Sequence, residues 1–158
     1  MEETFAKYIN VNGELMDLSC PQVMGILNVT PDSFYADSRK QAEEDIIRRV
    51  HQIIEEGGRI IDIGAYSSRP DAEDVSPEEE MKRLKHGLQI IRREFPDAIV
   101  SVDTFRADVA QMCVEEYGTA IINDISAGNL DTNMFSTVAK LKAVSYTHLR
   151  AHETLRHL

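Results

Sequence analysis

Short apolar runs that end in polar, turn-forming residues recur four times in the sequence, and this pattern most constrains the fold. The first run, Val23 to Leu27, ends at Asn28 and the turn Thr30-Pro31-Asp32. Apolar runs of this length, bounded by turn residues, are typical of strands that are covered on both faces. The other three runs end in the same way and are Ile60 to Gly64, Ile99 to Thr104 and Ala120 to Ile125.

Segments with the helical spacing of apolar residues separate these runs. Ser38 and Ser76 stand at capping-box spacing from Gln41 and Glu79, and Pro77 suits the first position of a helix. The alternation of strands and helices predicts an α/β fold with a parallel sheet. Ligands are then expected at the carboxyl ends of the strands, whether the sheet closes into a barrel or stays open. The helical stripes are Ile46, Ile47, Val50, Ile53 and Ile54, then Met81, Leu84, Leu88 and Ile91, then Ala110, Cys113, Val114 and Tyr117.

Composition excludes several partners without selecting a chemistry. The formal net charge is -10, which argues against nucleic acid as a partner. No apolar run reaches the length of about 18 residues that a membrane span needs. The amino terminus, Met1 to Thr4, is acidic and unlike a secretory signal. We therefore expect a cytoplasmic protein that contacts neither nucleic acid nor membrane.

Four motifs at the predicted strand ends resemble those of the dihydropteroate synthase family, the folate-pathway enzymes that join 4-aminobenzoate to a pterin. Gly25 to Phe34 is similar to the first family signature, and Asp62 to Pro70 is similar to the second. Ser101 to Thr104 and Ile122 to Ser126 resemble the third and fourth strand ends. The resemblance implies a TIM-type barrel and spans the chain from about Val23 to about Leu141.

The chain is short for a complete barrel of this type, which has about 250 residues. It has 158 residues and supplies four strand-helix units of eight, the last helix being roughly Asp131 to Leu141. We therefore expect residues 1–141 to form the amino-terminal half of a pterin-binding barrel. Residues 142–158 lack a further apolar run and are expected to be an unrelated, disordered tail. The chain itself is expected to be an inactive fragment of an active transferase.

The reaction that the resemblance implies is the condensation of 4-aminobenzoate with 6-hydroxymethyl-7,8-dihydropterin diphosphate, which releases pyrophosphate. Such a site must help the leaving group depart and stabilise positive charge on the pterin methylene, and Mg²⁺ suits that task. We place Asn28 near the ion, because a hard cation accepts an amide oxygen together with water and phosphate oxygens. The alternative role for Asn28 is that of a capping or turn residue.

Two strand ends are expected to contact the pterin. Asp103 matches the acidic residue of the family's third strand end, where a carboxylate can accept ring N–H groups. Its alternative role is to cap a helix that begins near Thr104. Asn123 matches the amide at the pterin edge, whose donor and acceptor suit a heterocycle. Asp62 lies in the middle of a strand, so it needs a partner in the barrel interior and is expected to support the pterin site.

The resemblance assigns the diphosphate to the second loop, in which Ser68, Arg69 and Pro70 match the family motif. A guanidinium there can hold phosphate oxygens in a bidentate fork. The sequence departs from the common family pattern at two positions, because Ser68 replaces a threonine and Asp71 replaces a glycine. The second change leaves the exact backbone path of this loop undetermined by the resemblance. Four first-loop residues are expected to close over 4-aminobenzoate, namely Asp32, Ser33, Phe34 and Asp37. Which of the two acids faces the substrate is left open.

An alternative function is that of the pterin-binding domain of a folate-dependent methyltransferase. Such domains bind a methylated folate and need no diphosphate loops, so Asn28 to Phe34 and Ser67 to Pro70 argue against this function. The parent enzyme is expected to be a homodimer. In the half barrel, the fourth strand is expected to have an unpaired edge through which chains associate.

Overall fold

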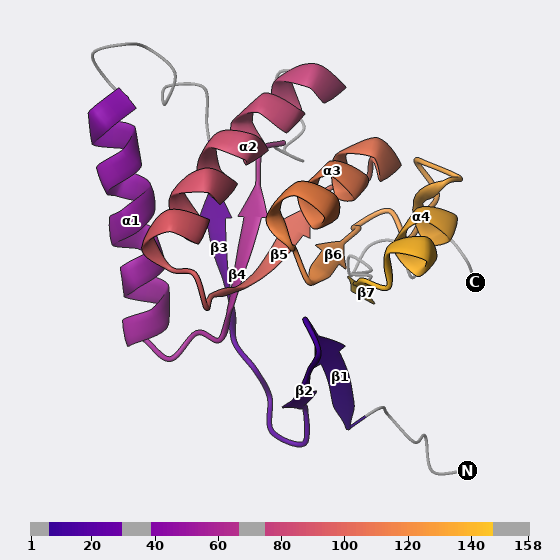
Figure 1. Cartoon of the computed structure of the whole chain (residues 1–158), viewed down its shortest axis with the longest axis horizontal. Helices are drawn as coiled ribbons and strands as arrows, with labels where there is room; N and C mark the ends of the chain where they lie inside the picture. Colours follow the sequence, from indigo (N-terminus) through magenta and orange to yellow (C-terminus); the bar gives the residue numbers. More distant parts are fainter. Residues whose placement is uncertain (1–6, 30–38, 67–74, 147–158) are drawn as a thin grey trace, which may run out of the picture.

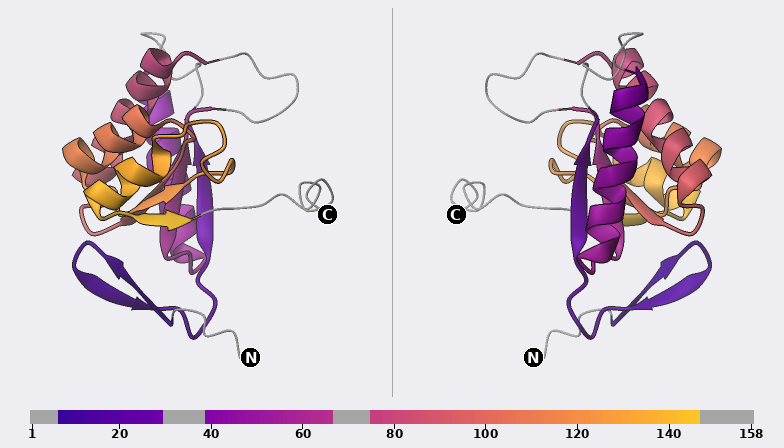
Figure 2. Two further views of the ribbon diagram at one scale, coloured as in Figure 1. Left: turned by 90° about the vertical axis from the view of Figure 1, so that its right-hand side faces the viewer. Right: turned by 90° about the vertical axis from the view of Figure 1, so that its left-hand side faces the viewer.

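A parallel sheet forms the centre of the computed structural model, which describes residues 7–29, 39–66 and 75–146. The sheet has five strands in the order β3-β4-β5-β6-β7, and its helices lie on one face (Figures 1 and 2). The chain alternates between strand and helix as predicted. The elements are β3 Met24–Asn28, α1 Arg39–Glu55, β4 Ile60–Gly64, α2 Pro77–Glu94, β5 Ile99–Asp103, α3 Ala107–Tyr117, β6 Ile121–Asn123, α4 Met134–Leu141 and β7 Val144–Tyr146.

One row of apolar side chains on the sheet packs against the helices. Leu27, Ile63, Val102 and Ile122 belong to a single buried cluster with helix residues such as Leu88. Apolar burial of this kind contributes about 25 cal/mol per Å² and fixes which face of each strand the helices cover. The residues that alternate with this row therefore face the other side of the sheet.

A glycine allows α2 to approach the sheet closely. A Cβ atom placed on Gly87 would lie 2.6 Å from the Cδ1 atom of Ile63, so any larger residue would displace the helix or the side chain. The start of α2 agrees with the predicted capping, because the Ser76 hydroxyl accepts a hydrogen bond of 3.2 Å from the Glu79 amide. The predicted cap Ser38 lies outside the described residues. Among the helices that are described, none combines the length and apolar character needed to cross a membrane.

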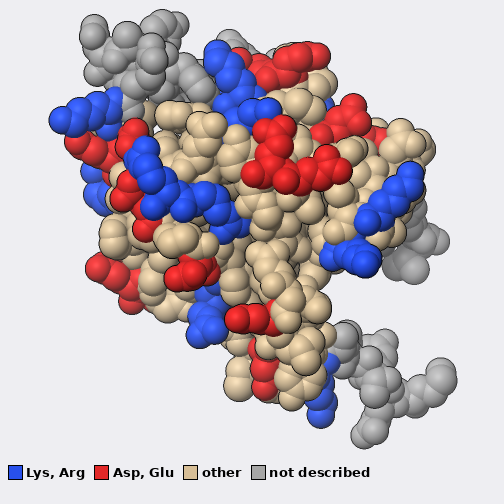
Figure 3. Space-filling view, in the orientation of Figure 1, with Lys and Arg blue, Asp and Glu red and all other residues tan. Residues whose placement is uncertain are grey.

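Charged side chains on the helices are mixed in sign on the face shown in Figure 3. Some of them join neighbouring helices: Glu43 of α1 pairs with Arg93 of α2, and Lys85 of α2 lies 2.9 Å from Glu116 of α3. These pairs are partly exposed to solvent, so each contributes at most about 1 kcal/mol to stability. The apolar row, rather than the ion pairs, holds the helices on the sheet.

A β-hairpin that sequence analysis did not predict precedes the sheet. Its strands are β1 Tyr8–Val11 and β2 Glu14–Asp17, and its turn is Asn12-Gly13, with φ angles of 52° and 92°. Asn-Gly is the common pair for a two-residue hairpin turn, because both positions need positive φ. Apolar residues of the hairpin pack beneath the amino-terminal ends of the sheet strands, in a cluster of Val11, Met16, Ile60, Ala120 and Ile121.

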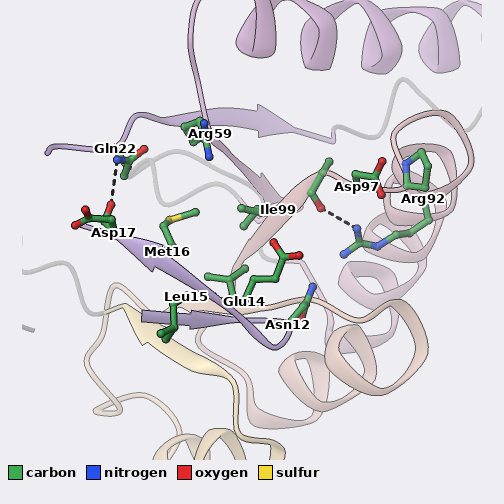
Figure 4. Close-up of a pocket in the computed structure, with 13 residues that line it drawn as sticks. Asn12, Glu14, Leu15, Met16, Asp17, Gln22, Arg59, Arg92, Asp97 and Ile99 are labelled. Atoms are coloured by element: carbon green, nitrogen blue, oxygen red, sulfur yellow. Dashed lines mark hydrogen bonds between the residues drawn. The ribbon is translucent and has the colours of Figure 1, made fainter. Parts of the chain in front are cut away.

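A pocket of about 710 Å³ lies between the hairpin and this amino-terminal end of the sheet (Figure 4). Several of its polar side chains form hydrogen bonds within the protein. Arg92 donates hydrogen bonds to the carbonyl oxygens of Ala98 and Tyr117, and Gln22 donates to that of Asp17. Ligand sites of parallel α/β folds lie at the opposite, carboxyl ends of the strands.

The structure corrects the predicted start of the tail. Val144–Tyr146 form β7, which pairs in parallel with β6, and the Val144 amide donates a 2.9 Å hydrogen bond to the Ala120 carbonyl. The prediction that residues 142–158 form an unrelated, disordered tail is therefore wrong for these three residues. Three residues with one partly buried valine give too short an apolar run to be detected. Residues 147–158 lie outside the described residues. Among the described strands, the edges of the sheet are β3 and β7 rather than β6.

Candidate active site

The last residues of the five parallel strands form one row across the carboxyl edge of the sheet. The pairing register places Asn28 beside Gly64, Gly64 beside Asp103, Asp103 beside Asn123, and Asn123 beside Tyr146. Residues paired in register point to the same face, and here that face is the one opposite the helices. The structure therefore brings Asn28, Asp103 and Asn123 to one edge, as predicted.

Gly64 leaves a space between two of these polar side chains. A Cβ atom built at this position would lie 3.6 Å from Oδ1 of Asn28 and 3.7 Å from Oδ2 of Asp103. The amide oxygen and the carboxylate thus face a common gap that a side chain on β4 would fill. Such a gap between oxygen atoms suits a cation or a polar ligand group.

A second set of polar side chains lies just below this row, on the same face. Asp62 is 6% exposed and Ser101 is 0% exposed, and the two are partners in the register of β4 and β5. The Asn123 amide nitrogen donates a 3.0 Å hydrogen bond to Oδ2 of Asp62. The prediction that Asp62 has a partner in the interior is therefore confirmed.

Three buried oxygen atoms of this set have no hydrogen-bond partner among the described residues. They are Oδ1 of Asp62, Oγ of Ser101 and Oδ1 of Asn123. Most buried polar atoms in proteins have such a partner, so a cluster of three indicates a place where water or a ligand supplies the missing hydrogen bonds. Burial also raises the pKa of Asp62 above its ordinary value, and the nearby Ser101 and Asn123 side chains offset part of that rise.

The raised pKa of Asp62 predicts a pH dependence of stability. The folded state binds the proton of Asp62 more tightly than the unfolded state does. The free energy of unfolding therefore falls as pH rises from the pKa of Asp62 in the unfolded chain to its higher pKa in the folded protein. An Asp62→Asn variant should therefore melt at a higher temperature than the unchanged chain at pH 7, and the difference should shrink towards pH 4. Thermal melts by circular dichroism at both pH values check this. A lower melting temperature at pH 7 would contradict it.

The described structure does not support the capping alternative for Asp103. Helix α3 begins at Ala107, its N-cap residue is Arg106, and the Ala107 amide donates a 2.8 Å hydrogen bond to the Asp131 carboxylate. Asp103 thus lies outside the first turn of the helix. The hydroxyl of Thr104, the next residue of the third motif, accepts a 3.2 Å hydrogen bond from the backbone amide of Arg106.

Asn123 and Asp124 are adjacent in the fourth motif, but they have different structural roles. The carboxylate of Asp124 is buried and accepts hydrogen bonds from the backbone amides of Ser126 and Gly128, both at 2.8 Å. It therefore holds the loop that follows β6. Asn123 points to the opposite side and belongs to the candidate site.

Several predicted site residues belong to the first and second loops. Asp32, Phe34, Ser68, Arg69 and Pro70 lie outside the described residues. Within the described ranges, no group of three or more histidine, cysteine or acidic side chains is arranged to hold a metal ion.

Sequence reasoning missed Ser101 and Arg106 as candidate site residues. Ser101 is a polar residue inside an apolar run. Its pairing with Asp62 on the neighbouring strand is the signal that could have identified it as a site residue. Arg106 forms an ion pair with Glu80 of α2, whose side chain is 0% exposed. A contact between residues 26 positions apart leaves no local signal in the sequence.

Comparisons with known proteins agree with this geometry. Residues 24–153 match the model of the family described as pterin binding enzyme. A dihydropteroate synthase of Staphylococcus epidermidis is 40% identical over 133 residues, which are 80% of this chain and 48% of that protein. A mitochondrial folate synthesis bifunctional protein of Arabidopsis thaliana is 41% identical over 142 residues, which are 88% of this chain and 26% of that protein.

Solved structures show the same likeness. The 7,8-dihydropteroate synthase of Vibrio fischeri superposes with a TM-score of 0.76 at 29% identity, over 92% of this chain and 50% of that one. The dihydropteroate synthase of Xanthomonas albilineans with 4-aminobenzoic acid gives 0.75 at 30% identity, over 93% and 53%. The chain thus spans about half the length of these structures and less than half that of the two sequence relatives. The residues that match the family model include all five strands of the sheet and the candidate site, and the chain belongs to the family of pterin-binding enzymes.

Proposed function

We propose that the chain carries the pterin-binding half of a dihydropteroate synthase. The observation that supports this most directly is the cluster of unpartnered buried oxygen atoms on Asp62, Ser101 and Asn123, beside the Asp103 carboxylate at the strand ends. A pterin ring presents N–H and NH₂ donors along one edge, and these would satisfy such acceptors. The named relatives and structures support the same function.

The chemistry proposed is a displacement at the methylene carbon of the pterin. The amine nitrogen of 4-aminobenzoate forms a bond to that carbon, while the carbon–oxygen bond to diphosphate breaks and the leaving group takes the electron pair. The amine then loses a proton. Because the arylamine is a weak nucleophile, positive charge grows on the pterin before the new bond is complete. A carboxylate held beside the ring stabilises that charge.

Each site residue then has a defined task. Asp103 accepts ring N–H groups and stabilises the positive charge. The hydrogen bond from the Asn123 nitrogen to Asp62 fixes the amide orientation, so that Oδ1 of Asn123 is directed to accept from the ring. Asp62 thus supports the site and contributes a further acceptor, as does Ser101.

Asn28 fits the proposed Mg²⁺ site, because its amide oxygen borders the gap beside Gly64 and water or diphosphate oxygens can supply the remaining ligands. When bound, the ion neutralises charge on the departing diphosphate. Asp32 and Phe34 are proposed to contact 4-aminobenzoate, and Ser68, Arg69 and Pro70 the diphosphate. We also propose a homodimeric, cytoplasmic parent enzyme, although two plant relatives are named as mitochondrial.

The proposed function can be tested by titrating the 158-residue chain with 6-hydroxymethylpterin and following the pterin fluorescence. We expect saturable binding that Asp103→Ala and Asn123→Ala each weaken by about tenfold, equal to about 1.4 kcal/mol. The control is Lys85→Ala, since this residue lies on the helical face in a solvent-exposed ion pair. Absence of binding by the unchanged chain, or equal binding by all three variants, would overturn the proposed function.

The gap beside Gly64 gives a further prediction. An alanine Cβ would contact Asn28 and Asp103 at ordinary van der Waals distances, so Gly64→Ala should fold normally. A valine would occupy the gap, and Gly64→Val should weaken binding of a pterin diphosphate in the presence of Mg²⁺ by about tenfold or more. Calorimetric titration measures the affinity, and the melting temperature of both variants reports on the fold. Full affinity in a folded Gly64→Val variant would show that no ligand uses the gap.

A further inference from the structure

The outer edge of β3 carries backbone groups that pair with no described strand. The residues on either side of the strand show which groups face β4. The Val23 carbonyl accepts a 2.9 Å hydrogen bond from the Arg59 amide, and the Val29 amide donates one of 2.9 Å to the Gly64 carbonyl. Backbone groups point to alternate sides along a strand, so the groups at the outer edge are those of Met24, Ile26 and Asn28.

An arginine of α1 binds the middle of this edge. The Nε atom of Arg49 donates a 3.1 Å hydrogen bond to the Ile26 carbonyl oxygen. The Nη1 atom of the same guanidinium donates one of 3.0 Å to Oε1 of Gln52, which holds it in place along the helix. Helix α1 lies alongside β3 in the right-hand view of Figure 2. Arg49 thus supplies a hydrogen bond that a further strand would otherwise donate to Ile26.

The remainder of the edge fits a second copy of this chain. Ile26 is 59% exposed and Val23 is 60% exposed, so the edge is apolar as well as unpaired. Two copies related by a twofold axis beside Ile26 would pair antiparallel, and each Ile26 would donate its N–H to the carbonyl of the other. The oxygen atom that Arg49 binds is the acceptor in that pair. The arginine and a second copy therefore compete for one place.

The opposite edge of the sheet offers fewer free groups. Strand β7 has three residues, and two of them bond to the β6 side: the Val144 amide donates to the Ala120 carbonyl, and the Tyr146 carbonyl accepts from the Asp124 amide. Within β7, only the backbone groups of Ser145 face outward. The edge of β3 is therefore the longer pairing surface of the described sheet.

We propose that Arg49 masks the outer edge of β3 and limits its pairing with the same edge of a second copy, whether or not the chain binds a pterin. Charged side chains on edge strands commonly prevent such pairing. Here the charge comes from a neighbouring helix and bonds directly to the strand backbone. Loss of the guanidinium leaves a free acceptor beside an exposed isoleucine, so a chain without it associates more tightly.

The test compares self-association of the 158-residue chain and its variants by sedimentation equilibrium. Arg49→Ala should lower the dimer dissociation constant by about tenfold. Arg48→Ala is the matched control, because it removes the same charge from the next position of α1, where Arg48 pairs with Asp45 on the surface. It should leave the dissociation constant unchanged, and melting temperatures show that each variant is folded.

A second pair of variants locates the contact. Ile26→Lys added to Arg49→Ala should weaken the dimer by about tenfold or more, because it places a charge on the edge itself. Ile54→Lys in the same background is its control, since Ile54 is a 45% exposed residue of α1. Amide hydrogen exchange adds a direct measurement: the Ile26 amide of Arg49→Ala should be protected only at concentrations where the dimer forms, and the Ser145 amide should not respond.

Three results would overturn the masking role. The first is an Arg49→Ala chain that associates no more tightly than Arg48→Ala. The second is tighter association without protection of the Ile26 amide, which would place the contact elsewhere. If Arg49→Ala fails to fold, Ile26→Lys in the otherwise unchanged chain decides the matter: it should weaken self-association, and an unaltered dissociation constant would show that copies do not pair through β3.

Discussion

An Asp103→Asn variant should lose about 99% of its turnover, a fall of about 100-fold, in a barrel completed with the missing strands of a dihydropteroate synthase. The amide keeps the shape of the side chain and one acceptor oxygen, so pterin binding should weaken only severalfold. The lost charge matters most when positive charge develops on the methylene, which places the effect on kcat. Steady-state kinetics and a direct pterin titration separate the two quantities.

The control for this experiment is Asp131→Asn. Asp131 bonds to the start of α3 at 2.8 Å, so its loss should lower stability and leave kcat nearly unchanged. Turnover by Asp103→Asn equal to that of the unchanged enzyme would return Asp103 to a purely structural role. A parallel fall in kcat and in pterin affinity would mean that it binds the ring without favouring the transition state.

Completing the barrel is expected to have the larger effect. The 158-residue chain should show little or no synthase activity, because its described sheet has five strands with open edges at β3 and β7. Apolar side chains on the face that helices do not cover are partly bare, as Ile26 is 59% exposed. Such edges and surfaces favour association. Size-exclusion chromatography should show dimers or larger species that retain helical circular dichroism.

The missing strands should be joined after Tyr146 rather than after Leu141, since β7 is part of the sheet. The completed barrel is expected to be active, and to lose that activity when Mg²⁺ is chelated. Activity that survives chelation would overturn the role given to Asn28. A monomeric 158-residue chain that melts cooperatively and turns over substrate would show that the proposed active-site assignments are wrong.

The strand-helix units were predictable because their signals are local. Apolar stripes, the Ser76 cap and the turn residues after each run are set by neighbours in the chain, and the structure has the predicted order. The row of Asn28, Asp103 and Asn123 was also predictable, since parallel strands that end in polar residues bring those residues to one edge. The buried oxygen atoms of Asp62, Ser101 and Asn123 that lack a hydrogen-bond partner could be recognised only in the structure.

Features that depend on distant residues were missed. The Asn12-Gly13 turn is a recognisable hairpin signal, but each hairpin strand has only four residues, and the two gain their burial from Ile60 and Ile121. Strand β7 has a single valine facing that cluster, and it owes its conformation to the edge of β6. The pair of Glu80 and Arg106 joins a helix to the loop after a later strand.

The hairpin beneath the sheet has a consequence for the order in which the molecule assembles during translation. Its residues are made before those of β6, yet Val11 and Met16 pack against Ile121, and the Asn12 side-chain amide donates a hydrogen bond to the Gly118 carbonyl 106 positions later. A two-stranded hairpin is at best marginally stable alone in water. Its packing is therefore complete only once β6 has been made, so a segment that precedes the whole sheet in the chain is among the last to be fixed in place.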